Sequence, residues 1–247
     1  MVDIVNKLFR VNVIDIVIYT VAVYAATVAI QIYQPATGGY FNLGESMIYL
    51  AALLSTPIVA GFAGGVGAAL ADLATGYAIF APGTLVIKFI EGYLAGILVS
   101  RFRKTHSILS FAVGVLYMGL IIFFASILWA GEVYYGPSEF LGMKFESPLI
   151  TIPLYIWIIV ALFVSGLVTY VTFRKFIQSS EAVLLLLAGL TMVLGYFLYE
   201  YFVSNPLLNR PPEAAVMEIP VNIGQAVIGA SIAIPVAGWL RKAGYGK

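Results

Sequence analysis

Residues 83–100 read GTLVIKFIEGYLAGILVS, an apolar run with only two charged side chains, Lys88 and Glu91. About 20 mostly apolar residues in an α-helix cross the hydrocarbon core of a bilayer. The run therefore predicts a membrane-spanning helix with two ionisable groups inside it. The rest of the chain has the same character, since 62% of its 247 residues are hydrophobic, 10% are charged and the mean hydropathy is +1.00. Soluble domains are only about half apolar, so this composition excludes a soluble globular enzyme.

Eight apolar runs follow one another along the chain. They are expected at residues 11–32, 44–56, 57–73, 83–100, 108–130, 150–173, 181–202 and 219–240. Pro57 separates the second run from the third, because proline lacks a backbone donor and disfavours helix in the residue before it. The sequence thus predicts an all-α, polytopic membrane helix bundle of about eight spans, with residues 1–247 forming a single integral membrane domain.

Basic residues beside the spans indicate the orientation, because lysine and arginine stay preferentially on the cytoplasmic side. With the N-terminus inside, the outer loops contain only Lys144 and Arg210. The inner segments contain Lys7, Arg10, Arg101, Arg103, Lys104, Arg174, Lys175, Arg241, Lys242 and Lys247. Both termini are therefore expected in the cytoplasm. The tryptophans at span ends, Trp129, Trp157 and Trp239, fit anchoring at the membrane interface.

Several kinds of chemistry lack the residues they need. Thirteen Lys and Arg against twelve Asp and Glu leave a net charge of +1, so no basic field is available to bind nucleic acid. The chain has no cysteine and one histidine, His106, which argues against a metal site. No G-x-x-x-x-G-K-[ST] motif occurs, so any ATP hydrolysis belongs to another chain. We expect neither enzyme activity nor a cofactor in this chain.

Polar side chains inside the spans are the candidates for a functional site, because a charge in hydrocarbon costs at least about 2.5 to 3.5 kcal/mol. Lys88 and Glu91 lie three residues apart and therefore on one helix face. Helical rise places both in the outer half of the membrane, together with Asp72 at the end of the preceding span. The predicted substrate-binding residues are Lys88, Glu91, Asp72, Asn222, Gln225, Asn42, Tyr77 and Tyr199.

Other interpretations of these residues stay open. Lys88 and Glu91 can neutralise each other as a structural pair. The tyrosines, Tyr196 included, fit an interfacial belt at least as well as a ligand site. Glu45 and Glu200 lie near the outer surface, so a solvated helix end fits them at least as well as a place in the site.

Three stretches resemble the substrate-binding S component of energy-coupling-factor (ECF) vitamin transporters. They are GGYFNLGESMIYLAALL (38–54), GFAGGVGAALADLATGYAIFAPGTLVIKFIEGYLAGIL (61–98), and GYFLYEYF (195–202) with EIPVNIGQAVIGASIAIP (218–235). The resemblance implies a membrane-embedded protein that captures a vitamin-like solute in the cytoplasmic membrane of a prokaryote. The family usually has six spans, which residues 11–100 and 181–240 would supply, so residues 108–173 look like an inserted helical hairpin.

The resemblance also implies partners. These are a transmembrane coupling protein and two cytoplasmic ATPase subunits, which would hydrolyse the ATP. In that family an Ala-xxx-Ala face of the first helix docks the coupling protein, and the residues matching that face are Ala22, Ala25, Ala26 and Ala29. Small residues at this spacing also allow close helix packing in general. The family's first outer loop closes over the ligand, which makes residues 33–43 a lid with Gly38 and Gly39 supplying flexibility.

Two other functions compete with substrate capture for an ECF transporter. A self-sufficient ion-coupled secondary transporter would need polar residues continued to the inner side or helices broken at the midplane. The inner half offers little beyond Asp15, which fits the inner interface, and the one break lies at Thr56 and Pro57. A membrane enzyme acting on lipids would need a cluster of reactive side chains at the cytoplasmic face. The substrate itself stays open: aromatic density suits a flat heterocycle such as riboflavin, and Lys88 favours an acceptor or anionic group on the ligand.

Overall fold

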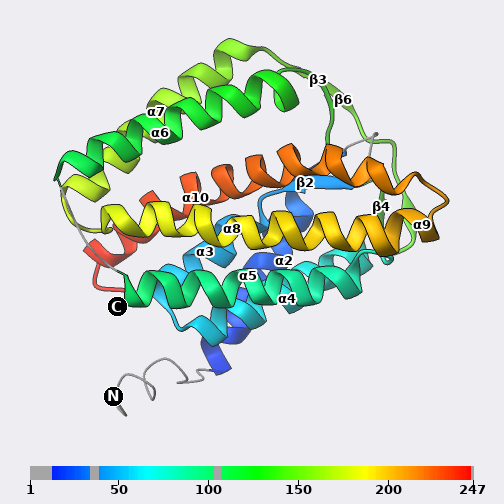
Figure 1. Ribbon diagram of the computed structural model, residues 1–247, viewed down its shortest axis with the longest axis horizontal. Helices are drawn as coiled ribbons and strands as arrows, with labels where there is room; N and C mark the ends of the chain where they lie inside the picture. The colour runs from blue at the N-terminus through cyan, green and yellow to red at the C-terminus, as the bar shows by residue number, and fades with distance from the viewer. Residues whose placement is uncertain (1–12, 34–38, 103–106, 246–247) are drawn as a thin grey trace.

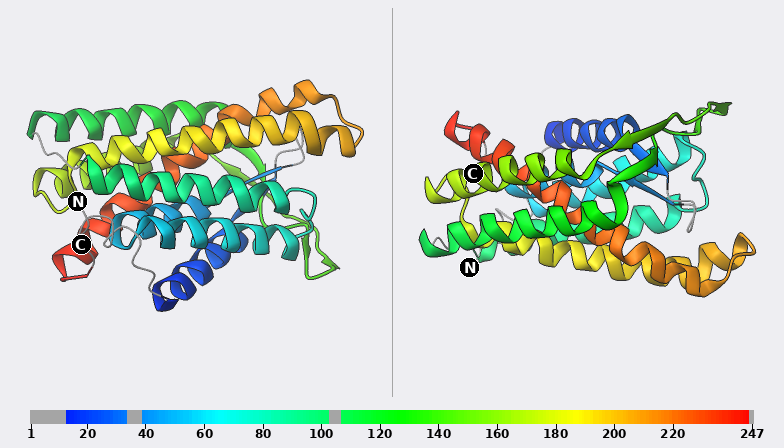
Figure 2. Two further views of the ribbon diagram at one scale, coloured as in Figure 1. Left: turned by 60° about the horizontal axis from the view of Figure 1, so that its bottom comes forward. Right: turned by 90° about the horizontal axis from the view of Figure 1, so that it is seen from above.

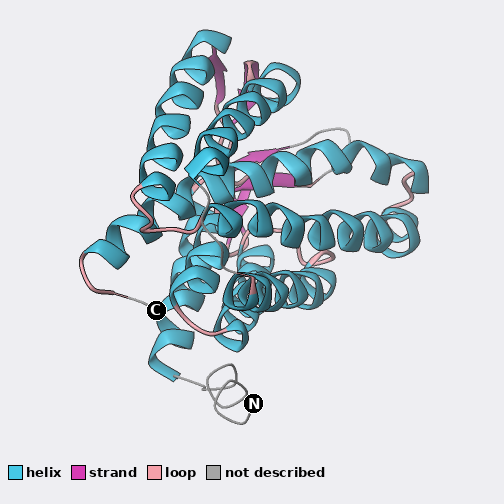
Figure 3. Cartoon of the chain, turned by 60° about the vertical axis from the view of Figure 1, so that its left-hand side comes forward, coloured by secondary structure: helices cyan, strands magenta, loops and turns pink. Residues whose placement is uncertain are grey.

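The computed structural model describes residues 13–33, 39–102 and 107–245, and most of their regular structure is helical (Figure 3). The main helices are α2 (Val13–Ala29), α3 (Gly44–Leu54), α4 (Pro57–Ala74), α5 (Ala81–Arg101), α6 (Ser107–Phe124), α7 (Leu154–Phe173), α8 (Ser179–Tyr199) and α10 (Glu218–Lys242). Short π or 3-10 turns and one short helix extend these: η1 (Ala125–Trp129), η2 (Glu200–Ser204), α9 (Asn205–Leu207) and η3 (Pro212–Met217). Within the described ranges, six helical segments are long and apolar enough to cross a membrane. The predicted all-α polytopic bundle is confirmed.

Helix α3 differs from the expected full span. Its 11 residues rise only about 16 Å, roughly half of a bilayer core, and nearly all of them are buried inside the bundle. The break after α3 lies where proline predicts it. Pro57 occupies the first turn of α4, and the Thr56 hydroxyl accepts a hydrogen bond from the Val59 backbone N–H at 3.4 Å. Helix α3 thus enters the membrane region as a central half-span.

The helices form layers (Figure 1). The α6–α7 hairpin lies on one side, α8 and α10 lie in the middle, and α2, α4 and α5 lie on the other side around the central α3. Helix α4 packs closely on α5, as its small residues predict: a Cβ added to Gly65 would lie 2.5 Å from the Leu85 carbonyl oxygen. Helix α2 lies at the edge of the bundle in both views of Figure 2.

The two ends of the bundle differ in charge and structure. The C-terminal ends of α5, α7 and α10 lie at one end, and the strands lie at the other (Figures 1 and 2). The first end therefore carries the basic residues Arg101, Arg174, Lys175, Arg241 and Lys242. There the Arg241 guanidinium donates to both carboxylate oxygens of Glu181, at 2.9 and 3.0 Å, and to the Leu53 carbonyl at 2.6 Å. These bonds fix α10 to the start of α8 and the end of α3.

Strands replace loop or helix at several predicted positions. Strand β1 (Gln31–Tyr33) takes the last two residues of the expected first span and pairs antiparallel with β2 (Tyr40–Asn42), which lies inside the expected loop. The segment between α6 and α7 contains β3 (Gly131–Tyr134) paired with β6 (Leu149–Ile152), and β4 (Glu139–Phe140) paired with β5 (Met143–Lys144). The expected helix start at residue 150 is therefore wrong. Pro153 disfavours helix in the residue before it, and α7 begins only at Leu154.

The strands of the α6–α7 hairpin connect to the β1–β2 hairpin. Ile32 and Tyr135 form an isolated antiparallel bridge, and the Gly136 N–H donates to the Gln31 carbonyl at 2.8 Å. The Trp129 ring packs 4.9 Å from the Phe41 ring and is fully buried. Interfacial anchoring is therefore wrong for Trp129, because the β1–β2 hairpin and α10 cover it.

Candidate substrate-binding site

A pocket lies beneath the β1–β2 hairpin at the end of the bundle that carries the strands. Its walls come from α2, β2, α4, α5, α8 and the start of α10, and its cavity volume is about 40 Å³. The lining residues are Thr27, Gly39, Tyr40, Asn42, Ala68, Asp72, Phe80, Thr84, Lys88, Tyr196, Glu200, Glu218, Asn222 and Gln225. This volume has room for a few water molecules, so a solute of vitamin size requires the walls to move apart.

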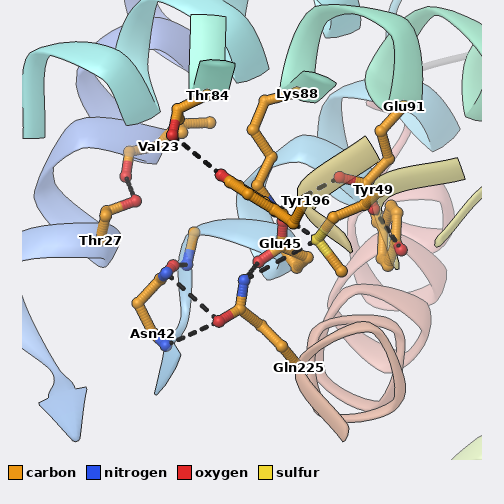
Figure 4. Close-up of polar contacts among 12 residues, drawn as sticks. Val23, Thr27, Asn42, Glu45, Tyr49, Thr84, Lys88, Glu91, Tyr196 and Gln225 are labelled. Carbon is orange, nitrogen blue, oxygen red and sulfur yellow. Dashed lines mark hydrogen bonds and ion pairs between the residues drawn. The ribbon is translucent and has the colours of Figure 1, made fainter. Parts of the chain in front are cut away.

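Lys88 lies between two carboxylates in the wall of this pocket (Figure 4). Its ammonium contacts Glu45 from the first turn of α3 and lies 3.4 Å from Glu91, one turn further along α5. All three side chains are buried, with exposed fractions of 3% or less. The Tyr196 ring centroid lies 5.4 Å from the ammonium. A buried charge needs such compensation, and here two acids supply it.

Gln225 connects this ion pair to the β1–β2 hairpin. Its amide nitrogen donates to Glu45, and its carbonyl oxygen accepts from the Asn42 backbone N–H at 3.0 Å and side-chain amide at 3.3 Å. The Asn42 side-chain oxygen in turn accepts from the Gly44 N–H at 2.8 Å. A Cβ on Gly44 would lie 2.3 Å from the Thr27 hydroxyl oxygen, so only glycine fits this junction. The end of β2 is thus hydrogen-bonded to both α3 and α10.

Asp72 forms a second connection to the hairpin. The Tyr40 hydroxyl donates to one Asp72 oxygen, Oδ1, at 2.6 Å, and the Tyr40 ring lies 4.4 Å from that of Tyr77. Burial, with the nearby Asp72 carboxylate, raises the pKa of Tyr40 well above its ordinary value. Tyr40 therefore keeps its proton and remains a hydrogen-bond donor at neutral pH. The other Asp72 oxygen, Oδ2, is buried and has no hydrogen-bond partner among the described residues.

Two acidic residues, Glu200 and Glu218, form a further part of the pocket wall. Glu200 lies in the π-turn η2, and Glu218 opens α10 one turn before Asn222. Both glutamates are at most 4% exposed. Single π-turns inside helices are frequent at functional sites because they redirect side chains.

The structure brings five of the eight predicted substrate-binding residues into this pocket: Lys88, Asp72, Asn222, Gln225 and Asn42. The other three lie behind or beside it. Glu91 accepts a hydrogen bond from the Tyr49 hydroxyl at 2.7 Å, and the Tyr199 hydroxyl donates to the Ile79 carbonyl at 2.7 Å. Tyr77 packs against Tyr40. That these residues bind a substrate stays a prediction. Of the two lid glycines, Gly39 lines the pocket and Gly38 falls outside the described residues.

Three side chains have a different environment from the expected one. Glu45 and Glu200 fitted solvated helix ends, but their exposed fractions are 0% and 3%. Helices α5 and α10 cover Glu45, and Glu200 lies in the π-turn η2. Tyr196 lines the pocket instead of forming part of a belt, and its hydroxyl donates to Thr84 at 3.0 Å. Glu45 is the main residue that the sequence reasoning missed. Its signal is an acid that directly precedes a strongly apolar run.

The alanine face of α2 lies partly open. Ala25 and Ala29 are exposed, and Ala22 and Ala26 are half-buried. The neighbouring Val17, Ile18 and Val21 are more than half exposed, so the free face of this helix is apolar and flanked by large side chains. The four alanines form the part of this face that lies nearest the pocket.

The comparison with known families decides what kind of protein carries this pocket. A family model described as the S component of the ECF-type riboflavin transporter matches residues 10–164, which run from α2 into α7 and make up 155 of the 247 residues. The chain belongs to this family. As an S component of this family it is a multi-pass membrane protein.

Comparison with individual proteins adds one relative. A Pyrococcus woesei protein described as "Uncharacterized protein in gap 3'region" is 52% identical over 75 residues. This stretch covers 30% of the present chain and 50% of that relative, so the chain spans about half the length of the curated relative it matches. No solved structure matches the chain.

Proposed function

We propose that this S component is the substrate-capture subunit of an ATP-driven uptake transporter for a vitamin or a related small molecule. The observation that carries the proposal is the pocket under the β1–β2 hairpin. Polar side chains from residues 42, 72, 88, 222 and 225, scattered over most of the chain, converge there at low exposure. Polar groups at membrane depth are costly, and convergence on one cavity is what a binding site requires.

The pocket opens to the outside in this proposal. The basic ends of α5, α7 and α10 lie at the opposite end of the bundle, and basic residues stay preferentially on the cytoplasmic side. The same argument favours a cytoplasmic position for both termini, and the resemblance to ECF S components favours a prokaryotic cell. Solute would therefore be captured from outside and released inward only with help from partners.

The β1–β2 hairpin serves as the lid. Asn42 and Tyr40 fix it to Gln225 and Asp72 by hydrogen bonds, and the cavity beneath it is far smaller than a vitamin. Entry of solute therefore requires these bonds to exchange for bonds to the solute. Gly38 and Gly39 would give the lid its flexibility, because glycine adopts backbone conformations closed to other residues.

The free alanine face of α2 is the docking surface for a transmembrane coupling protein. Small residues let two helices approach closely in lipid, and Ala25 and Ala29 are exposed at the bundle edge. Two cytoplasmic ATPase subunits would complete the transporter. This chain contains no phosphate-binding loop of the G-x-x-x-x-G-K-[ST] type, so ATP is bound by those partners.

Native mass spectrometry of the purified protein, followed by solvent extraction of the retained small molecule, tests capture. We expect one solute per chain, and uptake of that solute only when a coupling protein and ATPases are co-expressed. Absence of any retained solute together with absence of uptake contradicts the proposal. Uptake into vesicles by this chain alone, driven by a proton or sodium gradient, would favour an ion-coupled carrier instead.

A further inference from the structure

The β4–β5 hairpin ends in an apolar tip at the end of the bundle that carries the pocket. Leu141, Met143 and Phe145 are each more than half exposed, although they lie in a connection between two helices and not in a span. In the left view of Figure 2 the hairpin projects on the side of the bundle that carries α2 and α4. Large apolar side chains gathered at an exposed position indicate a surface that contacts a partner or a membrane.

The turn at this tip has an unusual composition. It consists of Leu141 and Gly142, whose φ angles are 49° and 81°. Hairpin turns that need positive φ at both central positions favour Asn-Gly, because asparagine tolerates this conformation and a bulky side chain is strained in it. A leucine here weakens the turn and exposes an apolar side chain. Backbone strain of this kind indicates a role for the side chain beyond the turn itself.

Leu141 is continuous with the apolar surface of the helices. It lines a groove of about 420 Å³ between α2 and α4, together with Val21, Leu70 and Leu73, which are exposed apolar residues of those helices. The Leu141 N–H donates to the Ala74 carbonyl at 2.7 Å, which holds the tip at the end of α4. In a membrane protein, exposed apolar helix surface faces lipid. The tip therefore lies against a surface that lipid acyl chains contact.

Lys144 adds a charge that matches lipid headgroups. It is exposed on β5, between Met143 and Phe145 in the sequence. Lipid phosphates are negatively charged, and a lysine at the membrane interface extends its ammonium toward them while its methylene groups contact apolar surroundings. The tip thus combines apolar side chains for the acyl region with a cation for the headgroups, as segments that lie in the membrane interface do.

From these observations we infer that the β4–β5 hairpin is a lipid anchor, whose tip inserts Leu141, Met143 and Phe145 into the bilayer leaflet at the pocket end of the bundle. Lipid, and not a partner protein, is the contact, because this surface consists of large side chains whereas helix docking in membranes uses small ones. The inference goes beyond substrate capture, since it does not depend on which molecule the pocket binds.

Spin labels test the insertion. The chain has no cysteine, so single-cysteine variants can be labelled at chosen positions. Leu141→Cys and Met143→Cys report on the tip. Leu73→Cys, on the exposed apolar face of α4, is the lipid control, and Glu213→Cys, on the exposed side of η3, is the water control. In nanodiscs of phosphatidylcholine and phosphatidylglycerol, power-saturation EPR then compares collision rates with oxygen, which concentrates in lipid, and with a nickel chelate, which stays in water.

We expect the oxygen-to-nickel collision ratio at the tip to be at least threefold higher than at Glu213→Cys and to approach that at Leu73→Cys. A smaller difference at both tip positions overturns the inference. If one labelled tip variant does not fold, judged by gel filtration, the other decides.

A matched substitution separates insertion from a role in the turn alone. Leu141→Asn suits the positive φ of the turn and removes the apolar side chain. The oxygen-to-nickel ratio of the label at position 143 should therefore fall at least twofold in this background. The control Glu132→Gln, on the exposed side of β3, should leave that ratio unchanged. An unchanged ratio in Leu141→Asn shows that Leu141 does not hold the tip in lipid, which also overturns the inference.

Discussion

Removing the buried lysine gives the sharpest test of the polar network. Lys88→Met leaves Glu45 and Glu91 buried without a cation, since both contact the same ammonium. Removing one partner of a buried ion pair costs about 3–5 kcal/mol, because an uncompensated charge stays behind. For a chain of this size, that corresponds to a loss of roughly 6–20 °C in Tm, at about 2–4 °C per kcal/mol.

Additional substitutions should restore stability stepwise. Lys88→Met with Glu91→Gln still leaves Glu45 ionised in the protein interior, so recovery should be partial. The triple variant Lys88→Met, Glu45→Gln and Glu91→Gln removes every charge of the network, and replacing a complete buried ion pair by neutral groups is often nearly neutral for stability. The expected order of Tm is therefore single, double, triple, with the triple variant closest to wild type.

Thermal unfolding followed by gel filtration of the heated protein provides the measurement. Lys144→Met serves as the matched control, because Lys144 is exposed on β5 and should not change Tm. The solute affinity of the triple variant then shows whether the network contacts the solute or only supports the fold. A loss of at least tenfold, about 1.4 kcal/mol, indicates that the network contacts the solute, and wild-type affinity reduces it to a structural support. A single variant as stable as wild type would refute the reasoning.

Three further predictions concern the partner, the orientation and the lid. The double variant Ala25→Trp with Ala29→Trp should abolish co-purification with the coupling protein while solute affinity stays within twofold. The control Leu190→Trp, on the exposed face of α8, should change neither co-purification nor affinity. If the double variant still co-purifies with the coupling protein, the docking surface lies elsewhere. A cysteine at Ser138 should react with a membrane-impermeant thiol reagent added outside and one at Ser107 should not, and the reverse pattern would invert the topology. Asn42→Ala removes the side-chain amide that donates to Gln225, so the dissociation rate of the solute should rise several-fold in stopped-flow measurements. The exposed control Ser126→Ala should leave that rate unchanged. An unaltered rate for Asn42→Ala would show that the Asn42–Gln225 hydrogen bond does not hold the lid closed.

Local sequence patterns predicted the parts of the structure that local rules control. Helix α4 begins at Pro57 because a proline fits the first turn of a helix. Lys88 and Glu91 share one face of α5 because three residues make nearly one turn. Strands β3 and β6 escaped prediction because their apolar residues continue the hydrophobic runs of the adjacent helices. Strand identity there comes from pairing between residues that lie 15 to 21 positions apart in the chain.

The candidate site was predictable only in part, for a related reason. The sequence placed the polar residues in the outer half of the membrane, but it could not reveal which of them meet. Glu45 contacts Lys88 across 43 positions and Gln225 across 180, and such contacts are set by helix packing. Gly229 shows how these contacts depend on helix packing. A Cβ at this position would lie 2.3 Å from the Cβ of Glu45 and would force α10 away from α3.

The bridge between Ile32 and Tyr135 connects the proposed lid to the α6–α7 hairpin. Strand β1 cannot swing away from the pocket without either breaking its bonds to residues 135 and 136 or carrying β3 and β6 with it. Trp129 also restrains this contact between β1–β2 and the α6–α7 hairpin, because its ring packs between Phe41 and the backbone of Gly224. With the β1–β2 hairpin as the proposed lid, we expect the residence time of the solute to depend on a helical hairpin outside the pocket. In the proposed function, substitutions in that hairpin would change how long the solute stays bound without changing which solute binds.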